Sequence, residues 1–599
     1  MTDAIRYSEY YNLQPVFDGL YARSSDNEKF HNLMEIITDR NNIILAYRTI
    51  KSNTGSKTKG TDGQTIKDYK VLNENEYVHL IQGRFKNYKP SSIRRVLIPK
   101  QNGKKRPLGI PTMEDRIIQQ AIKQVLEPIC EAKFFKHSYG FRPNRSTHHA
   151  IARTLNLINV GKCHFVVDID IEGFFDNVNH NKLINQLYTL GVRDKELLAV
   201  IKKMLKAEIE GEGIAKKGVP QGGILSPLLS NIVLNELDQW IADQWETFEI
   251  ENPYSKDSNR WRALKSTNLK EGFLVRYADD FKVLTKNYET AKRWFHAIKN
   301  FLWKRLGLKI SPEKSKITNL RKIKTEFLGF SIRAVKKNNK RVAHSNISDK
   351  KKETIIRTIR DKVIKLSLSG NPRIAYDYNL YLRGVHNYFS VASHVAIDMK
   401  EIAYRVHRVI WNRLKVKFKY GHYKVKGYEK YNYQTFKVKD VCLIPIGAIR
   451  NNIPKQFNQD ITDFSQEGRK INQKSNLAYN MTRAINQIAR IYIEGRSIQY
   501  NDNRVSKFNA ARGKCHVTGI NLIQSISDYH CHHIIPLEQG GTDEFNNLVV
   551  LHKFAHYLVH ATRDETIDKY LKILNLTDKQ VKTLNKLRKS CKLESIKCN

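Results

Sequence analysis

Arg276-Tyr277-Ala278-Asp279-Asp280-Phe281 is the most informative stretch of this 599-residue sequence. Gly-Phe-Leu-Val precedes it at 272–275 and Lys-Val-Leu follows it at 282–284, which predicts a β-hairpin with two acids at its tip. Adjacent carboxylates between apolar strands are unfavourable unless a cation neutralises them. The stretch is therefore either an exposed Asp-Asp turn or part of a metal site.

The charge of the chain indicates a polyanionic partner. Its 103 Lys and Arg outnumber 59 Asp and Glu, for a formal net charge of +44. An excess of this size predicts nucleic-acid binding, with an anionic membrane surface as the alternative. No apolar run is long enough to span a bilayer, so we expect no membrane partner. Seven scattered cysteines and an N-terminus without a secretory signal favour a reducing, cytoplasmic location.

Two segments before residue 150 suit contacts with phosphates and bases. Residues 94–100 and 106–111 predict two strands joined by a turn, and basic side chains on such a ribbon suit clamping a triphosphate or a backbone. These side chains are Arg94, Arg95, Lys100, Lys104, Lys105 and Arg106. The segment Ser138–Ser146 places Arg142 and Arg145 beside aromatic residues, as stacking on bases requires.

A second acidic cluster and a glycine-rich turn follow. Residues 164–171 predict a strand in which Asp168 and Asp170 share one face. The alternative is an edge strand with a wet face. Glycines and Gln221 in the segment 218–227 precede a predicted helix over 228–240, which permits close approach of a substrate to the backbone. The alternative is a plain glycine turn before a core helix.

Taken together, these motifs resemble the reverse transcriptases encoded by group II introns. The matching blocks run in family order over about residues 40 to 330. They are Arg106–Pro111, Tyr139–Ser146, Asp168–Asn177, Gly218–Leu228, Tyr277–Asp280, Leu308–Ile317 and Phe327–Phe330. The resemblance implies a multidomain α+β protein, a right-hand polymerase whose fingers and palm contain an antiparallel sheet and whose thumb is helical.

The resemblance also implies roles for individual residues. In the family an aromatic residue lies five positions after the first catalytic acid, which selects Asp170, with Phe175 as the aromatic residue, rather than Asp168. Asp170, Asp279 and Asp280 would hold two Mg²⁺ ions. Phe175 would exclude a ribose 2′-hydroxyl, with a core phenylalanine as the alternative. The remaining nucleotide-binding residues would be Lys100 and Arg106 on the triphosphate, Gln221 in the pocket and Lys314 on pyrophosphate, with Lys316 near enough to compete with Lys314.

The region after residue 335 predicts three helices, over 349–366, 378–389 and 397–415. The segment Tyr381–Phe389, with Arg383, resembles the thumb, or domain X, of group II maturases. Lysines then alternate with aromatic residues over 415–439, a pattern typical of nucleic-acid binding. The lysines are Lys417, Lys419, Lys424, Lys426, Lys430, Lys437 and Lys439, of which the first five are the expected nucleic-acid contacts. A basic linker with locally packed tyrosines is the alternative. We expect a linker over 450–475 and a helix over about 477–494.

The C-terminal segment resembles an HNH nuclease, a β-hairpin and a helix around one metal ion. By motif, His533 would be the general base, and His532 and His556 would bind a divalent ion, with His560 as a candidate third ligand. We expect this ion to be Mg²⁺ and Asn547 to hold the loop of His533. The zinc knuckle of related domains has lost two of four ligands here, because Thr518 and Ala555 stand where cysteines are expected. We therefore expect a knuckle held by packing, without structural zinc.

The sequence thus predicts four domains: fingers and palm (1–335), thumb (336–415), DNA-binding region and linker (416–500) and HNH nuclease (501–599). The resemblance implies a protein that binds its intron RNA, promotes splicing, nicks target DNA and copies the RNA from dNTPs, and that associates with the nucleoid when on target DNA. Whether it is a dimer stays open. One alternative is a splicing factor with vestigial catalysis, which the retained acids disfavour. The other is a reverse transcriptase recruited to host defence, which the thumb and HNH motifs disfavour.

Overall fold

The computed structural model describes residues 7–99, 105–250, 254–472, 478–491, 493 and 495–596. The chain forms two compact units, each assembled from segments that are distant in sequence. The first comprises residues 1–133, 179–232 and 460–599, and the second comprises 134–178 and 233–459. Helices and antiparallel sheets occur in both units, which confirms the predicted multidomain α+β class. Within the described ranges, no helix is both long and apolar enough to cross a bilayer.

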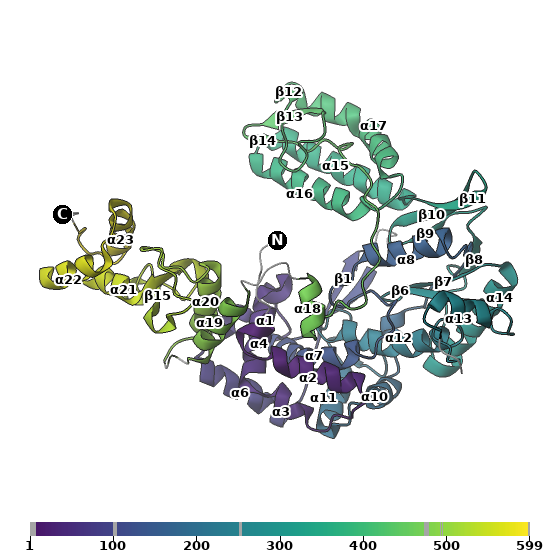
Figure 1. Ribbon diagram of the computed structural model, residues 1–599, viewed down its shortest axis with the longest axis horizontal. Coiled ribbons are helices and arrows are strands. Elements are labelled where there is room, and N and C mark those ends of the chain that lie inside the picture. The colour runs from purple at the N-terminus through teal and green to yellow at the C-terminus, as the bar shows by residue number, and fades with distance from the viewer. Residues whose placement is uncertain are drawn as a thin grey trace. The chain divides into compact units, whose positions relative to one another are not determined.

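Helices dominate the amino-terminal part of the first unit (Figure 1). They are α1 (Tyr7–Tyr10), α2 (Gln14–Ser25), α3 (Leu33–Ile37), α4 (Arg40–Ser52), α5 (Ile66–Tyr69), α6 (Glu74–Lys86), α7 (Met113–Glu131), α10 (His180–Thr189) and α11 (Lys195–Leu205). The antiparallel ribbon of β1 (Arg94–Pro99) and β2 (Lys105–Ile110) confirms the predicted basic hairpin. Lys100 and Lys104 lie outside the described residues. A second ribbon pairs β4 (Glu208–Ile209) with β5 (Gly213–Ile214).

Helix α7 is the core of this part. Met113, Ile117, Ala121 and Val125 recur every four residues and have no exposed surface, because one helical face packs against α2 and α4. Thr112 begins the helix by accepting a hydrogen bond from the backbone N–H of Asp115 through its side chain.

The carboxy-terminal part of the first unit contains the nuclease motifs. Its elements are α18 (Gln466–Asn472), α19 (Ala478–Arg490), α20 (Ile498–Ala510), β15 (Tyr529–His533), β16 (Leu548–His552), α21 (Lys553–His560), α22 (Asp564–Leu574) and α23 (Asp578–Ser590). Helix α18 corrects the expectation that 450–475 is only a linker. Its Arg469 pairs with both carboxylate oxygens of Asp18 on α2, at 2.6 and 2.7 Å, and this charged fork fixes the helix.

A four-stranded antiparallel sheet is the centre of the second unit. Its order is β6 (Phe273–Tyr277), β7 (Asp280–Thr285), β3 (Phe165–Ile169) and β8 (Lys316–Asn319). Helix α14 (Tyr288–Phe301) packs on β3, β7 and β8. The neighbouring helices are α8 (Thr147–Asn159), α9 (Phe174–Asn177) and α13 (Asp257–Leu264), and α12 (Ser226–Asp243) begins in the first unit and ends in the second. The predicted hairpin around the two acids is confirmed.

The rest of the second unit is a small sheet followed by a helical bundle. The sheet has the order β11 (Lys340–Ile347), β10 (Phe330–Lys337) and β9 (Thr325–Phe327). Figure 1 shows α15 (Asp349–Ser369), α16 (Pro372–Phe389) and α17 (Val395–Leu414) side by side, which confirms the three predicted helices. The strands β12 (Lys419–His422), β13 (Gln434–Val438) and β14 (Val441–Cys442) form a further antiparallel sheet beside them.

A buried carboxylate joins α20 to the amino-terminal helices of the first unit. Asp502 is 3% exposed and accepts hydrogen bonds from Arg48 Nη1 at 2.7 Å and Lys51 Nζ at 2.8 Å. Tyr11 donates its hydroxyl to the same group at 2.8 Å. Burial alone would raise the pKa of Asp502, but Arg48 and Lys51 outweigh it and hold the pKa at about 2. The two cations and the carboxylate therefore fix α20 on α4.

We predict that Asp502→Ala loosens α20 from α4. Removing one partner of a buried ion pair typically costs about 3–5 kcal/mol, because the other charge remains buried. Hydrogen exchange read by mass spectrometry should show faster exchange in both helices, while Asp568→Ala at an exposed site of α22 should change nothing. The folded-state pKa of about 2 is below the usual value, so the stabilisation is complete above about pH 4 and is lost as the pH falls toward 2. Unchanged exchange in Asp502→Ala would contradict this role.

Candidate active sites

The register of β3 and β7 brings three acids to one end of the central sheet. Ile169 pairs with Phe281 across these antiparallel strands. Asp170, which follows Ile169, therefore faces Asp280, which precedes Phe281, just beyond this last pair. Tyr277 pairs with Asp280, which leaves Asp279 in the tight turn of the hairpin. Three carboxylates at one end of the sheet match the donor set that hard divalent cations prefer.

The hairpin tip is held by a buried arginine. Arg276 on β6 is 1% exposed, and its Nη1 donates to the carbonyl oxygen of Ala278 at 2.8 Å. Its Nε lies 2.7 and 2.9 Å from the two carboxylate oxygens of Asp238 on α12, which has no exposed surface. Ala278 has φ +58°, a strained left-handed conformation for alanine. The arginine stabilises this turn and thereby fixes the position of Asp279.

Gly140 packs directly behind the tip. A Cβ atom at this position would lie 2.2 Å from the backbone nitrogen of Ala278, which is far closer than atoms can approach. Tyr139 donates its N–H to the carbonyl oxygen of Arg276 at 2.9 Å. The segment around Gly140 therefore supports the tip through its backbone, and only glycine fits there.

Asp168 is neutralised by a lysine that the sequence reasoning did not single out. Lys282 on β7 is 2% exposed, and its Nζ lies 2.8 Å from Asp168 Oδ1 and 3.7 Å from Asp280 Oδ1. Thr325 also donates to Asp168, at 3.4 Å. Asp168 is thus committed to an internal ion pair, which favours Asp170 as the metal-facing acid of this strand. A lysine opposite acids in an apolar strand is the signal that could have found this pair.

The electrostatics of the cluster show crowded negative charge. Burial, followed by the carboxylates of Asp168, Asp279 and Asp170, raises the pKa of Asp280 to about 6, although Lys282 acts in the opposite direction. Carboxylates that share a site in this way require a nearby positive charge to ionise together. The donor set therefore fits divalent metal ions.

Lys314 contacts the acidic cluster, and Phe175 is more exposed than its neighbour Phe174. Lys314 Nζ is 3.1 Å from Asp170 Oδ2 and its side chain is 67% exposed, so it reaches the carboxylate cluster from solvent. No such contact is found for Lys316 among the described residues, which favours Lys314. Phe174 is buried whereas its neighbour Phe175 is half-buried, so Phe174 is the core residue of the pair.

The nucleotide-binding candidates of the first unit lie on β2 and the glycine-rich loop. Arg106 is exposed on β2, and Lys100 lies outside the described residues. The backbone carbonyl oxygen of Gln221 accepts a hydrogen bond from the N–H of Gly109 at 2.6 Å. Gly222 has φ +113°, and a Cβ there would lie 2.5 Å from the Gly109 carbonyl oxygen. The close approach that this glycine permits is therefore to β2 itself, and the side chain of Gln221 is half-buried.

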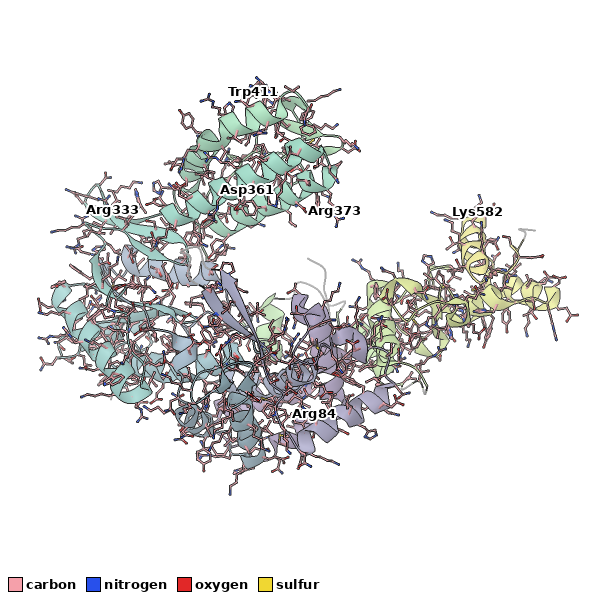
Figure 2. The ribbon with its side chains drawn as sticks, turned by 180° about the vertical axis from the view of Figure 1, so that it is seen from behind. Arg84, Arg333, Asp361, Arg373, Trp411 and Lys582 are labelled. Atoms are coloured by element: carbon pink, nitrogen blue, oxygen red, sulfur yellow. The ribbon has the colours of Figure 1, made fainter. Side chains whose placement is uncertain are left out.

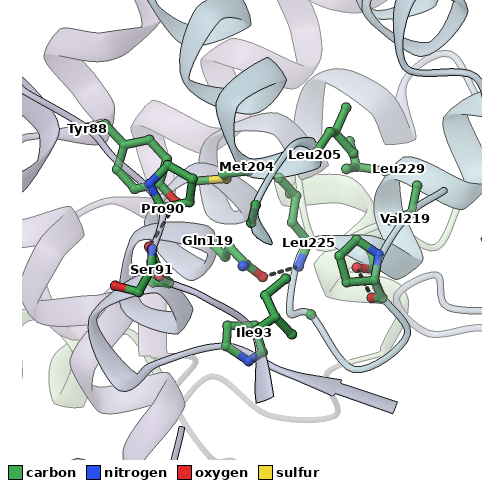
Figure 3. Close-up of a pocket in the computed structure, with 16 residues that line it drawn as sticks. Tyr88, Pro90, Ser91, Ile93, Gln119, Met204, Leu205, Val219, Leu225 and Leu229 are labelled. Atoms are coloured by element: carbon green, nitrogen blue, oxygen red, sulfur yellow. Dashed lines mark hydrogen bonds between the residues drawn. The ribbon is translucent and has the colours of Figure 1, made fainter. Parts of the chain in front are cut away.

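A small cavity lies behind this loop (Figure 3). Gln119 on α7 accepts hydrogen bonds from the N–H groups of Ile224 at 2.8 Å and Leu225 at 3.4 Å, which fixes the start of α12. The cavity of about 30 Å³ is much smaller than the few hundred Å³ of a ligand site. It is a packing space behind the loop and does not hold a nucleotide.

The nuclease motif forms a second candidate site, on β15, β16 and α21. Antiparallel pairing of His533 with Leu548 closes the β-hairpin from which α21 continues. His533 Nε2 lies 2.8 Å from Asp543 Oδ1, and its ring stacks on Tyr500 with the centroids 5.1 Å apart. A carboxylate that orients a histidine is typical of a general base. Asp543 was missed in the sequence, although it follows the Gly-Gly pair in the same loop.

Asn547 holds the loop of His533, as predicted. Its side-chain amide donates to the carbonyl oxygens of Ile535 and Thr542, both at 2.9 Å. Its amide oxygen accepts from the N–H of Ile535 at 2.9 Å. These bonds join both ends of the loop between β15 and β16.

Three side chains beside the β15–β16 hairpin form a candidate metal-binding group. His532, His560 and Cys591 each offer a ligand atom, and these atoms all lie within 4.8 Å of one another. Burial, followed by the neighbouring histidines, lowers the pKa of His532 to about 3, so it is neutral, as a metal ligand must be. His556 does not belong to this group, and its ring lies on His530 with the centroids 3.6 Å apart. Cys591 was not singled out in the sequence.

Comparison with known proteins identifies the family. Residues 98–332 match the family described as reverse transcriptase (RNA-dependent DNA polymerase), and residues 515–561 match the HNH endonuclease family. The chain is 31% identical over 448 residues to the group II intron-encoded protein LtrA of Lactococcus lactis subsp. cremoris, which covers 63% of this chain and 74% of the relative. The chain belongs to the group II intron-encoded proteins. It combines a reverse transcriptase with an HNH endonuclease, and membership implies intron RNA and DNA as partners and divalent metals as cofactors.

The chain is also similar to two further proteins. The chain is 34% identical over 321 residues to protein YkfC of Escherichia coli strain K12, covering 50% of this chain and 82% of the relative. It is 29% identical over 392 residues to the putative COX1/OXI3 intron 1 protein of Saccharomyces cerevisiae, covering 60% and 45%.

The residues expected to bind nucleic acid in this group II intron-encoded protein divide into two sets. Arg142 is a correction, because it is buried and donates to the carbonyl oxygens of Phe135 at 2.7 Å and Ser138 at 3.0 Å. It holds its own loop. Arg145 lies over the ring of Phe457 at 4.4 Å. The exposed residues are Arg383, Lys417, Lys419, Lys424, Lys426 and Lys430.

The exposed lysines surround partly exposed aromatic rings. Trp411 of α17 contacts Tyr420 with the centroids 5.2 Å apart, and Tyr420 contacts Phe436 at 4.8 Å. Figure 2 labels Trp411 on the last of the three helices of the bundle. Trp411 is 36% exposed and Tyr420 is 43% exposed, so the rings pack locally and still present surface to a partner. The local packing agrees with the alternative of locally packed rings, and nucleic-acid binding by this segment stays a prediction.

The zinc-knuckle position is occupied by packed and hydrogen-bonded groups. Cys515 is buried and its sulfur accepts from the N–H of Thr518 at 3.5 Å. His552 caps α21 by accepting from the N–H of Phe554 at 3.2 Å, and Ala555 is buried. The absence of structural zinc remains a prediction.

We predict that Gly140→Ala reduces DNA synthesis more than about tenfold, because the added methyl group displaces the tip and small misplacements of catalytic groups are costly. Primer extension on an RNA template measures this loss. Gly83→Ala in α6, where a Cβ meets nothing within 4 Å, should leave synthesis unchanged. Full activity of Gly140→Ala would show that the tip does not depend on this packing.

Proposed function

We propose that this protein binds its intron RNA, promotes splicing, nicks target DNA with the HNH domain and reverse-transcribes the RNA from the new 3′ end. The observation that carries the proposal is the strand register, which places Asp170 opposite Asp280 and beside the turn that contains Asp279. A splicing factor with vestigial catalysis has no use for a buried arginine and a buried lysine dedicated to this acidic cluster. The retained charge network therefore favours an active polymerase.

For polymerisation, Asp170, Asp279 and Asp280 would hold two Mg²⁺ ions. When bound, such ions lower the pKa of the primer hydroxyl and neutralise the leaving pyrophosphate. Lys282 keeps Asp168 paired, so that strand β3 presents one acid to the metals rather than two. Lys314, exposed beside Asp170, would donate a proton to pyrophosphate. The half-buried Phe175 would lie beneath the sugar and exclude a 2′-hydroxyl.

We assign a right-hand polymerase architecture to the chain. In this assignment, residues 1–335 form fingers and palm, with the four-stranded sheet as the palm floor, and 336–415 form the thumb. Arg106 and Lys100 on the basic ribbon would bind the triphosphate of a dNTP, and Gln221 would line its pocket. Residues 416–500 would bind DNA through exposed lysines and partly exposed rings, with Arg145 and Arg383 on RNA. Residues 501–599 would be the nuclease.

For strand nicking, His533 would take a proton from water. Asp543 Oδ1 lies 2.8 Å from Nε2 and Tyr500 covers one ring face, so Nδ1 would be the nitrogen that takes the proton. His532 and His560 would hold a divalent ion against the scissile phosphate, as a Lewis acid when bound. His556, packed on His530, would join only after its ring turns away.

We expect Asp279→Ala to abolish RNA-templated DNA synthesis, by more than about 10³-fold, because a metal-holding carboxylate is lost. Primer extension measures synthesis, and a nicking assay on target DNA should remain at the wild-type level. Asp170→Asn should behave like Asp279→Ala, whereas the exposed Asp176→Asn should keep activity. Persistent synthesis by Asp279→Ala would refute the metal assignment.

His533→Ala should abolish strand nicking alone and leave synthesis from a supplied primer intact, since the two sites have separate residues. Nicking of a labelled duplex, resolved on a denaturing gel, measures this directly. Asp543→Asn should weaken nicking more than about tenfold without changing synthesis, because the imidazole loses its orienting carboxylate. If His533→Ala still nicks DNA, the general base lies elsewhere.

A further inference from the structure

Cys591 lies beside the nuclease histidines although it is far from them in sequence. Its Sγ is 3.9 Å from His532 Nε2, and His560 Nε2 is 3.4 Å from His532 Nδ1. The three residues come from β15, from the last turn of α21 and from the C-cap of α23. A tetrahedral site with bonds of about 2.0–2.3 Å separates its ligand atoms by about 3.3–3.6 Å. Cys591 and His560 approach different nitrogens of the His532 ring, and one imidazole binds an ion through one nitrogen. With one ligand atom taken from each residue, the three atoms lie within 4.8 Å of one another, so small side-chain movements would bring them to the spacing that one ion requires.

The position of Cys591 is fixed by the fold. Its backbone N–H closes α23 by donating to the carbonyl oxygens of Leu587 at 3.1 Å and Arg588 at 2.9 Å. Arg588 is 3% exposed and donates to the carbonyl oxygens of Leu558 at 2.6 Å and Ala561 at 2.8 Å at the end of α21. This buried guanidinium ties α23 to the helix that carries His560. The thiol is therefore held near the histidines by a dedicated contact.

A buried cysteine usually serves as a small apolar side chain. Cys531 in the same strand as His532 is such a case, since it packs in a core with Tyr500 and Leu548. Cys591 differs because its sulfur faces the ring nitrogen of a buried histidine. Its surroundings contain metal-ligand atoms rather than only apolar groups.

We propose that Cys591 is a ligand of the nuclease metal ion, together with His532 and His560. This inference rests on the proposed nuclease function and adds a ligand from the C-terminal helix. Binding would form a metal–sulfur bond and release the thiol proton to solvent. Soft thiolate and imidazole ligands select zinc or a similar transition ion over Mg²⁺. Three protein ligands would leave a fourth position for water or the scissile phosphate, as in catalytic zinc sites.

The test uses metal-free full-length protein titrated with Co²⁺ and followed by absorption. A thiolate ligand gives a sulfur-to-cobalt charge-transfer band in the near ultraviolet. We expect this band in the wild type and its loss in Cys591→Ser. The affinity for Co²⁺ and Zn²⁺ should also fall more than about tenfold in Cys591→Ser, because even the loss of a residue that only hydrogen-bonds a ligand typically costs that much. Cys515→Ser and Cys442→Ser should keep the band, which separates Cys591 from the knuckle and from the second unit. Absence of the band in the wild type, or its persistence in Cys591→Ser, would overturn the proposal.

A second variant covers the case in which Cys591→Ser fails to fold. Cys591→Asp keeps a ligand of harder character and should move metal preference from Zn²⁺ toward Mn²⁺ and Mg²⁺ in the same titration, with circular dichroism as the folding control. Unchanged preference would overturn the proposal. Nicking assays distinguish the two hypotheses: a wild type that shows the thiolate band but never nicks DNA refutes the nuclease function alone. Nicking without a thiolate band refutes only the role of Cys591.

Discussion

The buried ion pair between Arg276 and Asp238 is the interaction on which the acidic hairpin tip depends. One guanidinium binds the carboxylate on α12 and the carbonyl oxygen of the strained residue Ala278. Breaking such a pair would leave a charge without compensation in the core, at a cost of about 3–5 kcal/mol. The same arginine therefore joins strand, helix and catalytic turn. The turn can be strained because its position is determined by these contacts rather than by its own preference.

The acids around this turn differ in their charged neighbours. Asp168 and Lys282 form an internal pair, while Asp170 and Asp280 face each other at the open end of the sheet. Lys282 also lies 3.7 Å from Asp280, so one buried cation reduces repulsion without occupying the metal-facing side. Excess negative charge remains at this end of the sheet, and in the proposed function divalent ions would neutralise it. The arrangement explains how four acids can lie close together in a folded protein.

The candidate nuclease site is held together differently. Its candidate ligands come from separate elements that side-chain hydrogen bonds to backbone carbonyl groups hold together. Arg588 binds two carbonyl groups at the end of α21, and Asn547 ties both ends of the catalytic loop. Nitrogen and sulfur atoms, rather than carboxylates, surround the proposed metal position. One chain would thus hold hard cations for polymerisation and a softer ion for nicking, and selective metal addition could separate its two activities.

The sequence alone predicted the hairpin at 276–281 and the three bundle helices, because local periodicity carries this information, and the resemblance of its motifs to the family proposed Asp170 and His533 as site residues. The sequence could not show that Asp168 pairs with Lys282, that Arg142 bonds within its own loop or that Cys591 lies beside the histidines. Those assignments depend on strand register and on contacts between residues separated by tens to hundreds of positions. Spacing along a chain says which residues share a face, but only tertiary packing decides which charges and ligands meet across it.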